Sequence, residues 1–234
     1  MLQMQFECRI CSGILIKAGK LKSGKHRCKC KECYKYRFLD YKRKPFDTSN
    51  YNKLIEIYLE GCGIRSLGRI FNISPDTVIN VIRKESAKVH KPQNFQVLSN
   101  YEMDQLNLFV GKKSNRIWLI YAIEKDSKQV VGFKIGSGSK LILYYVIKQI
   151  LSFNPKRVYT DKLNIYPSLI TDSIHRTTRF KTNTIERLNL TLRTQLKRLL
   201  RKSICFSRSI DMLKATLKLF FWLYRGHLKL FVNL

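Results

Sequence analysis

Two cysteine pairs near the beginning of the chain have the spacing of metal ligands. Cys8 and Cys11 form one Cys-x-x-Cys pair, and Cys30 and Cys33 form the other. Two such pairs can surround one zinc ion with four thiolates. A disulfide pair and a redox-active pair are the alternatives. The opening segment has no apolar run long enough for a signal peptide, so we expect a reducing compartment and a structural Zn²⁺ ion on these four cysteines.

Cys28 leaves one ambiguity in the ligand set. It precedes Cys30 in the run RCKCKEC, and its use would place four residues between the ligands of the second pair. Cys30 repeats the spacing of the first pair and is therefore favoured. Glycines between the pairs suit a short hairpin, so residues 1–40 are predicted to form a zinc ribbon, too small to fold without its metal.

Three acidic residues of the second half stand where they could do chemistry together. The chain has 16 Asp plus Glu against 45 Lys plus Arg, which makes every acid notable. Asp104 enters an apolar strand-like run, Asp161 follows the strand RVYT, and Glu186 lies in the first turn of a long helix. Carboxylates brought together repel one another and need cations to stay ionised. Hard oxygen ligands favour Mg²⁺ or Mn²⁺, and two such ions about 3.5 to 4 Å apart promote phosphoryl transfer.

The other acids of this half receive simpler interpretations. Glu102 is two residues before Asp104 on the same strand face, so it is the alternative to Asp104 or its helper. The rest are expected to be solvated surface residues: Glu124, Asp126, Asp172 and Asp211.

A helix-turn-helix unit is predicted for residues 48–87. Helical periodicity begins at Tyr51 and stops at Gly61, and a second short helix covers residues 64–71. Ser74 and Pro75 supply an N-cap and a first helical residue for a third helix that reaches about Ala87. An ordinary three-helix core is the alternative. The outward residues suited to a DNA major groove are Thr77, Asn80, Arg83 and Lys84.

A separate domain is predicted for residues 99–234, after an aperiodic boundary at 88–99. Strand-like runs at 106–110, 117–123 and 130–135 are followed by a helix at 141–151 and a strand at 157–160. A helical turn at 166–171, a short strand at 177–180 and a long helix from Thr184 complete the order βββαβαβα. This is the order of a ribonuclease-H-like α/β domain, so the whole chain is predicted to be a multi-domain α+β protein.

The charge of the chain favours a polyanionic partner. The formal net charge is +29, and hydrophobic residues make up 44% of the chain, enough for a real core. Counterion release from a phosphate backbone uses such a field, and an anionic membrane surface is the weaker alternative. No run of 18 uncharged apolar residues exists, so no membrane span is expected, and the apolar segment 217–234 is interpreted as a C-terminal core helix.

The segment TNTIERLNLTLRTQLKRLLRKSICFSRS, residues 182–209, resembles the signature block of the insertion-sequence-1 family of transposases. The resemblance extends over nearly the whole chain. That family joins a zinc ribbon and a helix-turn-helix to a DDE catalytic domain of ribonuclease-H-like fold, and the positions that match its triad are Asp104, Asp161 and Glu186. The chain departs from the family pattern at Gln105 and Asn107, where an acidic residue and an aromatic one are usual.

The resemblance implies a DDE transposase that cuts the ends of a mobile element and joins the freed 3′-hydroxyl to target DNA. It implies two Mg²⁺ or Mn²⁺ ions, double-stranded DNA as partner, at least a homodimer on DNA, and a cytoplasmic, nucleoid-associated location. Family members use a basic residue seven positions after the Glu to contact DNA. Here this is Arg193, about 10.5 Å along the same helix face.

The basic neighbours of Arg193 are expected to position phosphates, with a solvated helix face as the alternative. They are Arg187, Lys197, Arg198, Arg201 and Lys202. A competing function from another class is a DNA-binding protein without catalysis, either a repressor or the product of a decayed element.

Overall fold

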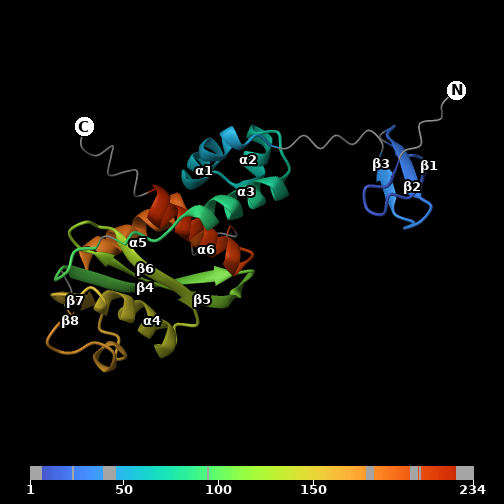
Figure 1. Ribbon diagram of the computed structural model, residues 1–234. Helices are drawn as coiled ribbons and strands as arrows, with labels where there is room; N and C mark the ends of the chain where they lie inside the picture. The colour runs from blue at the N-terminus through green and yellow to red at the C-terminus, as the bar shows by residue number, and fades with distance from the viewer. Residues whose placement is uncertain are drawn as a thin grey trace. The chain divides into compact units, whose positions relative to one another are not determined.

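The computed structural model divides into two compact units, Met1–Phe46 and Asp47–Leu234 (Figure 1). It describes residues 7–22, 24–38, 46–93, 95–177, 182–200, 205 and 207–224.

The first unit is a three-stranded antiparallel sheet with almost no hydrophobic core. Its strands are β1 (Leu15–Lys20), β2 (His26–Cys30) and β3 (Tyr36–Phe38), in the order β1-β2-β3. The expected hairpin is therefore present, with a third strand added after the second cysteine pair. Among the described residues of this unit, the buried ones are Cys8, Cys28 and Cys30. Burial of three thiols cannot offset the entropy of ordering such a chain, so this unit needs a further source of stability.

The second unit begins with three helices whose boundaries follow from local sequence. They are α1 (Tyr51–Leu59, after the short 3₁₀ turn η1, Thr48–Asn50), α2 (Ile64–Ile70) and α3 (Pro75–Lys88). Gly61, at φ +89°, ends the first helix in a conformation that side chains disfavour. Ser74 Oγ accepts the Thr77 N–H at 3.1 Å, and Pro75 occupies the first turn, as expected. The apolar stripes meet in a small core.

The remaining elements surround a five-stranded sheet. Its strands are β4 (Asn100–Val110), β5 (Lys112–Glu124), β6 (Val130–Gly136), β7 (Arg157–Thr160) and β8 (His175–Thr177). They lie in the order β6-β5-β4-β7-β8, with β4 antiparallel to β5 but parallel to β7. An antiparallel meander extended by parallel crossover strands on its first strand is the ribonuclease-H-like topology, which confirms the predicted fold class.

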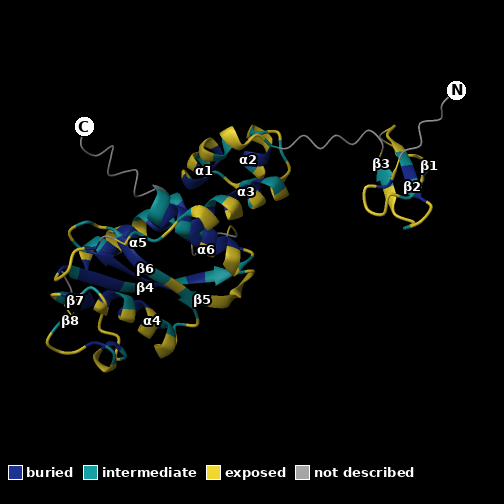
Figure 2. Ribbon diagram, in the orientation of Figure 1, coloured by how far each residue is buried: buried dark blue, intermediate teal, exposed yellow. Residues whose placement is uncertain are grey.

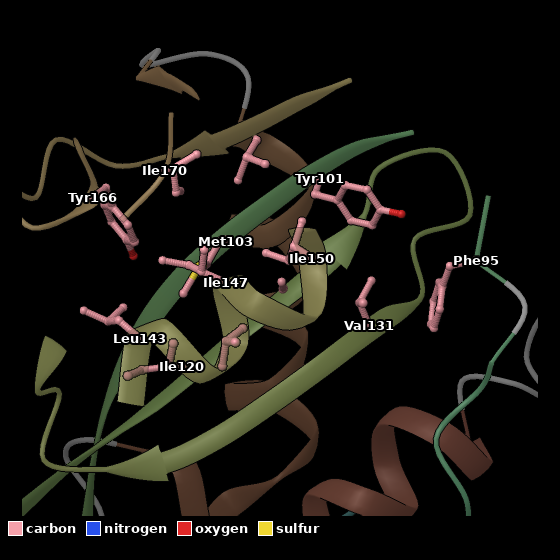
Figure 3. Packing of buried hydrophobic residues seen from close by; sticks show 13 residues of the cluster. Phe95, Tyr101, Met103, Ile120, Val131, Leu143, Ile147, Ile150, Tyr166 and Ile170 are labelled. Atoms are coloured by element: carbon pink, nitrogen blue, oxygen red, sulfur yellow. The ribbon is translucent and has the colours of Figure 1, made fainter. Parts of the chain in front are cut away.

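Helices cover both faces of this sheet (Figure 1). They are α4 (Lys140–Leu151), η2 (Tyr166–Ser168), α5 (Asn183–Gln195), η3 (Lys197–Leu199), α6 (Ile210–Lys218) and the π-helical segment η4 (Leu219–Tyr224). Alternate residues of β4 point to opposite faces. Tyr101 and Met103 join Leu143 and Ile147 of α4 in the main core (Figure 3). On the opposite face, the Tyr121 ring stacks on Phe221 at 5.5 Å between centroids. The strands are therefore largely buried, and the outer sides of the helices are exposed (Figure 2).

The three N-terminal helices of this unit pack against α6 and η4. The Tyr58 hydroxyl and Thr216 Oγ1 are 2.7 Å apart, and both residues are buried. A Cβ placed on Gly61 would lie 2.6 Å from the carbonyl oxygen of Gln195, so the backbone after α1 touches the end of α5. The helix-turn-helix and the sheet domain thus form one compact unit.

Several elements differ from those expected. The turn at 166–171 is a single 3₁₀ turn, and β8 begins at His175 while residues 178–180 lie outside the described part. The last predicted helix ends at Gln195, because Leu196 has a non-helical ψ of 88°, and the chain then forms η3 and α6. The expected C-terminal core helix is confirmed as far as Tyr224, with Phe220 and Phe221 buried.

The interpretation of Glu124 as a solvated surface residue was wrong. Glu124 is only 3% exposed, and its Oε1 accepts the Gln96 N–H at 3.1 Å. The packing of the segment before β4 over the end of β5 buries it, which the turn-like sequence around it did not indicate. Asp126, Asp172 and Asp211 are exposed as expected. Within the described residues, no helix has the length and apolar character needed to cross a bilayer.

Candidate active site and metal centre

The two cysteine pairs meet in one cluster. The Sγ atoms of Cys8, Cys11, Cys30 and Cys33 all lie within 4.8 Å of one another. Cys8 Sγ is 3.7 Å from Cys33 Sγ, and Cys11 Sγ is 3.4 Å from Cys30 Sγ. A tetrahedron with metal–sulfur bonds of about 2.3 Å has edges of about 3.8 Å, so the cluster has the size that zinc requires. Cys28 is buried in β2 outside this cluster.

Backbone N–H groups within each pair favour thiolates. Hydrogen bonds from the backbone of Ile10 and Cys11 lower the pKa of the Cys8 thiol to about 6. The backbone of Cys33, and more weakly that of Glu32, lowers the pKa of Cys30. For Cys11, the Gly13 backbone acts to lower the pKa, but the neighbouring thiols, led by Cys30, raise it to about 12. Four thiolates therefore require a cation among them, and the donor set fits zinc.

The register of the central strands places two of the predicted carboxylates side by side. β4 and β7 run parallel, with Glu102 paired to Tyr159. Asp104 and Asp161 each lie two residues further along, so they occupy neighbouring positions at the same edge of the sheet, about 4.8 Å between strands. Asp104 is half-buried and Asp161 exposed. The sheet alone thus brings together residues 57 positions apart in sequence.

Asp104 is held by α5, the helix that carries Glu186. Asn189 Nδ2 donates to Asp104 Oδ2 at 2.5 Å, and the Tyr121 hydroxyl donates to Asn189 Oδ1 at 2.8 Å. Burial raises the pKa of Asp104, the Gln105 N–H and Asn189 oppose this, and the charges of Asp161 and Glu186 raise it further. The three carboxylates therefore interact electrostatically, although they do not form a cluster as tight as that of the cysteines.

Glu102 anchors the N-terminus of α5 to the central strand. Its side chain is fully buried, and its Oε2 accepts the Ile185 N–H at 2.8 Å. Its Oε1 lies 3.4 Å from Lys125 Nζ, and that ammonium also lies 4.9 Å from the centre of the Tyr159 ring. A carboxylate at a helix N-terminus is favoured by the unpaired N–H groups there. Glu102 thus fixes the turn that carries Glu186.

Glu186 is exposed in the first turn of α5, and its Oε1 accepts from Thr182 Oγ1 at 3.0 Å. Glu186, Asn189 and Arg193 follow one another at i, i+3 and i+7, the spacing of one helix face. Arg193 is half-buried on this helix. The face that carries the predicted DNA contact is therefore the face that touches Asp104.

Sequence reasoning missed the residues that hold the carboxylates in place. Asn189 could have been found, because helical spacing places it on the same face as Glu186 and Arg193. Tyr121 and Lys125 carry no local signal, because only the pairing of β4 with β5 brings them near. Gln105 points to the opposite sheet face, where its Nε2 donates to the Tyr166 hydroxyl at 3.3 Å.

Besides Arg193, the predicted DNA-contacting residues fall into three groups. Asn80, Arg83, Lys84, Arg187 and Lys197 are exposed. Thr77 and Arg198 are half-buried; the Thr77 hydroxyl lies 2.9 Å from Ser74 Oγ in the α3 cap, and Arg198 donates to Ser207 Oγ at 3.2 Å. Arg201 and Lys202 lie outside the described residues.

The comparison with known families identifies the domain that carries these carboxylates. The family model described as IS1 transposase matches residues 97–223. The chain belongs to the IS1 transposase family. The matched region contains all of β4 to α6, and the cysteine cluster and the three N-terminal helices precede it.

Curated relatives give the same result. The InsB protein of insertion element iso-IS1n from Shigella dysenteriae is 36% identical over 110 residues, which cover 47% of this chain and 84% of that protein. The InsB protein of insertion element IS1 4 from Escherichia coli K12 is 32% identical over 131 residues, covering 56% and 78%.

Solved structures are more distant. A simian T-cell lymphotropic virus intasome in complex with the PP2A regulatory subunit B56 gamma gives a TM-score of 0.38 at 15% identity, covering 71% of this chain and 66% of that chain. The HTLV-2 integrase catalytic core domain in complex with magnesium, in a trimeric form, gives a TM-score of 0.38 at 16% identity, covering 54% and 88%.

Proposed function

We propose that this IS1-family transposase binds the terminal inverted repeats of a mobile element and catalyses metal-dependent strand cleavage and strand transfer. The observation that carries the proposal is the convergence of Asp104, Asp161 and Glu186 from two neighbouring strands and the first turn of α5. Two of these carboxylates are exposed, so a DNA phosphate has access to them.

The oxygen donors suit two Mg²⁺ or Mn²⁺ ions. Bound there, such ions would activate an attacking oxygen and stabilise a leaving one. The charges of Asp161 and Glu186 raise the pKa of Asp104, a repulsion that bound cations would relieve. Asn189 orients the Asp104 carboxylate, and Arg193 on the same helix face is assigned to a DNA phosphate.

The burial of Glu102 supports its assignment as an anchor rather than a ligand. Both of its oxygens face groups of the protein, the Ile185 N–H and the Lys125 ammonium, and its side chain has no solvent exposure. Asp104 is the more open of the two acids on this strand face. The departure of Gln105 from the family pattern does not affect Asp104, because the two side chains lie on opposite faces of the sheet.

The cysteine cluster is assigned to a structural zinc ion, and α3 to the reading of the element ends. Exposed Asn80, Arg83 and Lys84 project from the side of α3 opposite its buried stripe. Such a helix suits a major groove. We assign the protein to the cytoplasmic nucleoid and to at least a dimer on DNA, since two element ends must be joined.

The decisive experiment is strand cleavage and joining on a labelled duplex that carries the element's own end, in Mg²⁺ or Mn²⁺. Wild type is compared with Asp161→Asn and Glu186→Gln, and with Asp172→Asn as the matched control, because Asp172 is an exposed acid of the same domain outside the site. We expect nicking and joining by wild type and the control alone, with DNA binding retained by all four proteins.

Two results would contradict this assignment. Cleavage by Asp161→Asn or Glu186→Gln would remove those residues from the catalytic role. Binding of intact element ends without cleavage by wild type, in both metals, would instead identify a DNA-binding protein without catalytic activity.

A further inference from the structure

A basic cavity lies where the three N-terminal helices of the second unit meet the sheet domain. Its volume is about 530 Å³. One wall comes from α1, α2 and α3 with the turn at Gly61. The other comes from η3, Cys205, residues 207–209 and the start of α6. Both walls belong to the same compact unit, Asp47–Leu234.

The charged side chains that line the cavity are all positive. The lining contains five basic residues, Arg65, Arg83, Lys197, Arg198 and Arg208. The described residues of the lining include no Asp or Glu. Three hydroxyl-bearing residues, Tyr58, Ser207 and Ser209, add hydrogen-bonding groups. Cations gathered in a cleft with low-dielectric walls raise the local concentration of anions.

Arg198 joins the two walls. Its guanidinium carbon lies 5.3 Å from the centre of the Tyr58 ring on α1, and its Nη1 donates to Ser207 Oγ at 3.2 Å. Tyr58 is held in turn by Thr216 of α6 at 2.7 Å. These contacts keep the walls together without using Arg65 or Arg208, which are both exposed.

We propose that the phosphate backbone of a DNA duplex lies along this cavity, so that the joint between the three helices and the sheet domain is itself a DNA-binding surface. Arg83 belongs both to the cavity and to the outward side of α3, and Lys197 follows the end of α5, which carries Glu186. The cavity therefore connects the helix assigned to DNA reading with the helix of the active site.

This inference rests on the proposed function, because the ligand is the same DNA. A duplex fits better than a small anion, since cations come from both walls of the cavity and two of them, Arg65 and Arg208, are exposed. Each phosphate neutralised by a cation makes the slope of log affinity against log salt concentration steeper by about 0.9.

The first test is the binding of full-length protein to a duplex of the element's end over a range of salt concentrations. The double variant Arg65→Gln, Arg208→Gln is compared with Lys140→Gln, Lys148→Gln, which removes two exposed lysines from α4 on the opposite face of the sheet. We expect the slope of log affinity against log salt to fall by about 2 in the cavity variant and not in the control.

The second test uses the two cysteines of the cavity, Cys62 and Cys205, as native probes. Mass spectrometry follows their alkylation by N-ethylmaleimide with and without the duplex. We expect DNA to slow the alkylation of both in wild type and the α4 control, and this protection to weaken in Arg65→Gln, Arg208→Gln at equal DNA concentration.

The outcomes separate this inference from the proposed function. Suppose that wild type binds and cleaves element ends, that both double variants have the same salt slope, and that both cysteines react at the DNA-free rate. This result would overturn the cavity as a DNA site and leave the transposase function intact. Failure of wild type to bind or cleave element ends would overturn the proposed function, and the cavity proposal with it.

Discussion

The cysteine cluster and the carboxylate site are built in opposite ways. The four cysteines lie between positions 8 and 33, and the backbone of each pair lowers the pKa of its own first thiol. The three carboxylates span positions 104 to 186 and depend on strand register, on Glu102 and on Asn189. The first site is local and lacks a supporting core, whereas the second is distant in sequence and takes its geometry from a large core.

The largest expected effect comes from removing one ligand of the local site. Cys30→Ser should lose the zinc ion and unfold the first unit, because structural zinc supplies on the order of 10 kcal/mol to modules of this kind. The second unit should keep its thermal unfolding midpoint. Metal content and amide hydrogen exchange measure the two effects.

Cys28→Ser is the matched control for that substitution. Cys28 is as buried as Cys30 and lies on the same strand, but outside the cluster. It should retain one zinc ion per chain. A Cys30→Ser protein that also binds one zinc ion with an ordered first unit would show that the cluster is not the metal site.

Breaking the anchor of the distant site should cost less. Glu102→Ala removes the acceptor of the Ile185 N–H and the carboxylate beside Lys125, which should lower the free energy of unfolding by about 2 to 4 kcal/mol. Glu102→Gln keeps an acceptor for the Ile185 N–H, so its free energy of unfolding should fall by less than that of Glu102→Ala. Urea unfolding of the three proteins measures this order.

Comparison of Glu102→Gln with Asp104→Asn separates an anchor from a metal ligand. If Glu102 holds α5 in place, Glu102→Gln should retain strand cleavage with the same metal dependence as wild type, while Asp104→Asn should lose it. Equal loss of cleavage in both would make Glu102 a ligand.

The contact between the three helices and the sheet domain should be sensitive to one methyl group. Gly61→Ala combines a φ of +89° with a Cβ 2.6 Å from the Gln195 carbonyl oxygen, and should destabilise the second unit by about 1 to 3 kcal/mol. Gly111→Ala isolates the backbone component, since its φ is +75° but the nearest atom is 3.9 Å away. Equal unfolding free energies for the two variants would contradict a tight joint.

The smallest effect concerns the charge of Asp104. Burial raises the pKa of this carboxyl in the folded state above its unfolded value, so the folded protein binds more protons between the two pKa values and loses stability as the pH rises through that range. Asp104→Asn should therefore unfold at a higher temperature than wild type at pH 7.

Thermal unfolding from pH 7 downward checks the sign of this effect. The advantage of Asp104→Asn should shrink as the pH falls toward the ordinary Asp range near 3.8. An advantage that grew on acidification would mean that the ionised carboxylate stabilises the fold.

Sequence predicted the elements well where local chemistry defines them. Ser74 with Pro75 placed the start of α3, and the strand RVYT and the helix after Gly138 were found nearly to the residue. Leu196, by contrast, has no sequence feature that ends a helix, yet its backbone leaves the helical conformation next to the point where Gln195 meets Gly61. The burial of Glu124 likewise depends on a segment 28 residues away.

The candidate sites divide in the same way. The spacing of the cysteines was sufficient to choose Cys30 over Cys28. The positions of Asp104, Asp161 and Glu186 could be predicted from fold order, but the contacts that aim them could not. The interactions of Asn189, Tyr121 and Lys125 join residues 64 to 85 positions apart or lie across strands, and no local pattern encodes them.

At Gly61 the backbone after α1 meets the end of α5, the helix that carries Glu186. If α3 reads the element end as proposed, its packing against the sheet domain would hold the recognised sequence at a set distance from the carboxylates. The number of base pairs between the recognised sequence and the broken bond is then a property of the polypeptide, and an element end lengthened by half a helical turn between the two would be bound but left uncut.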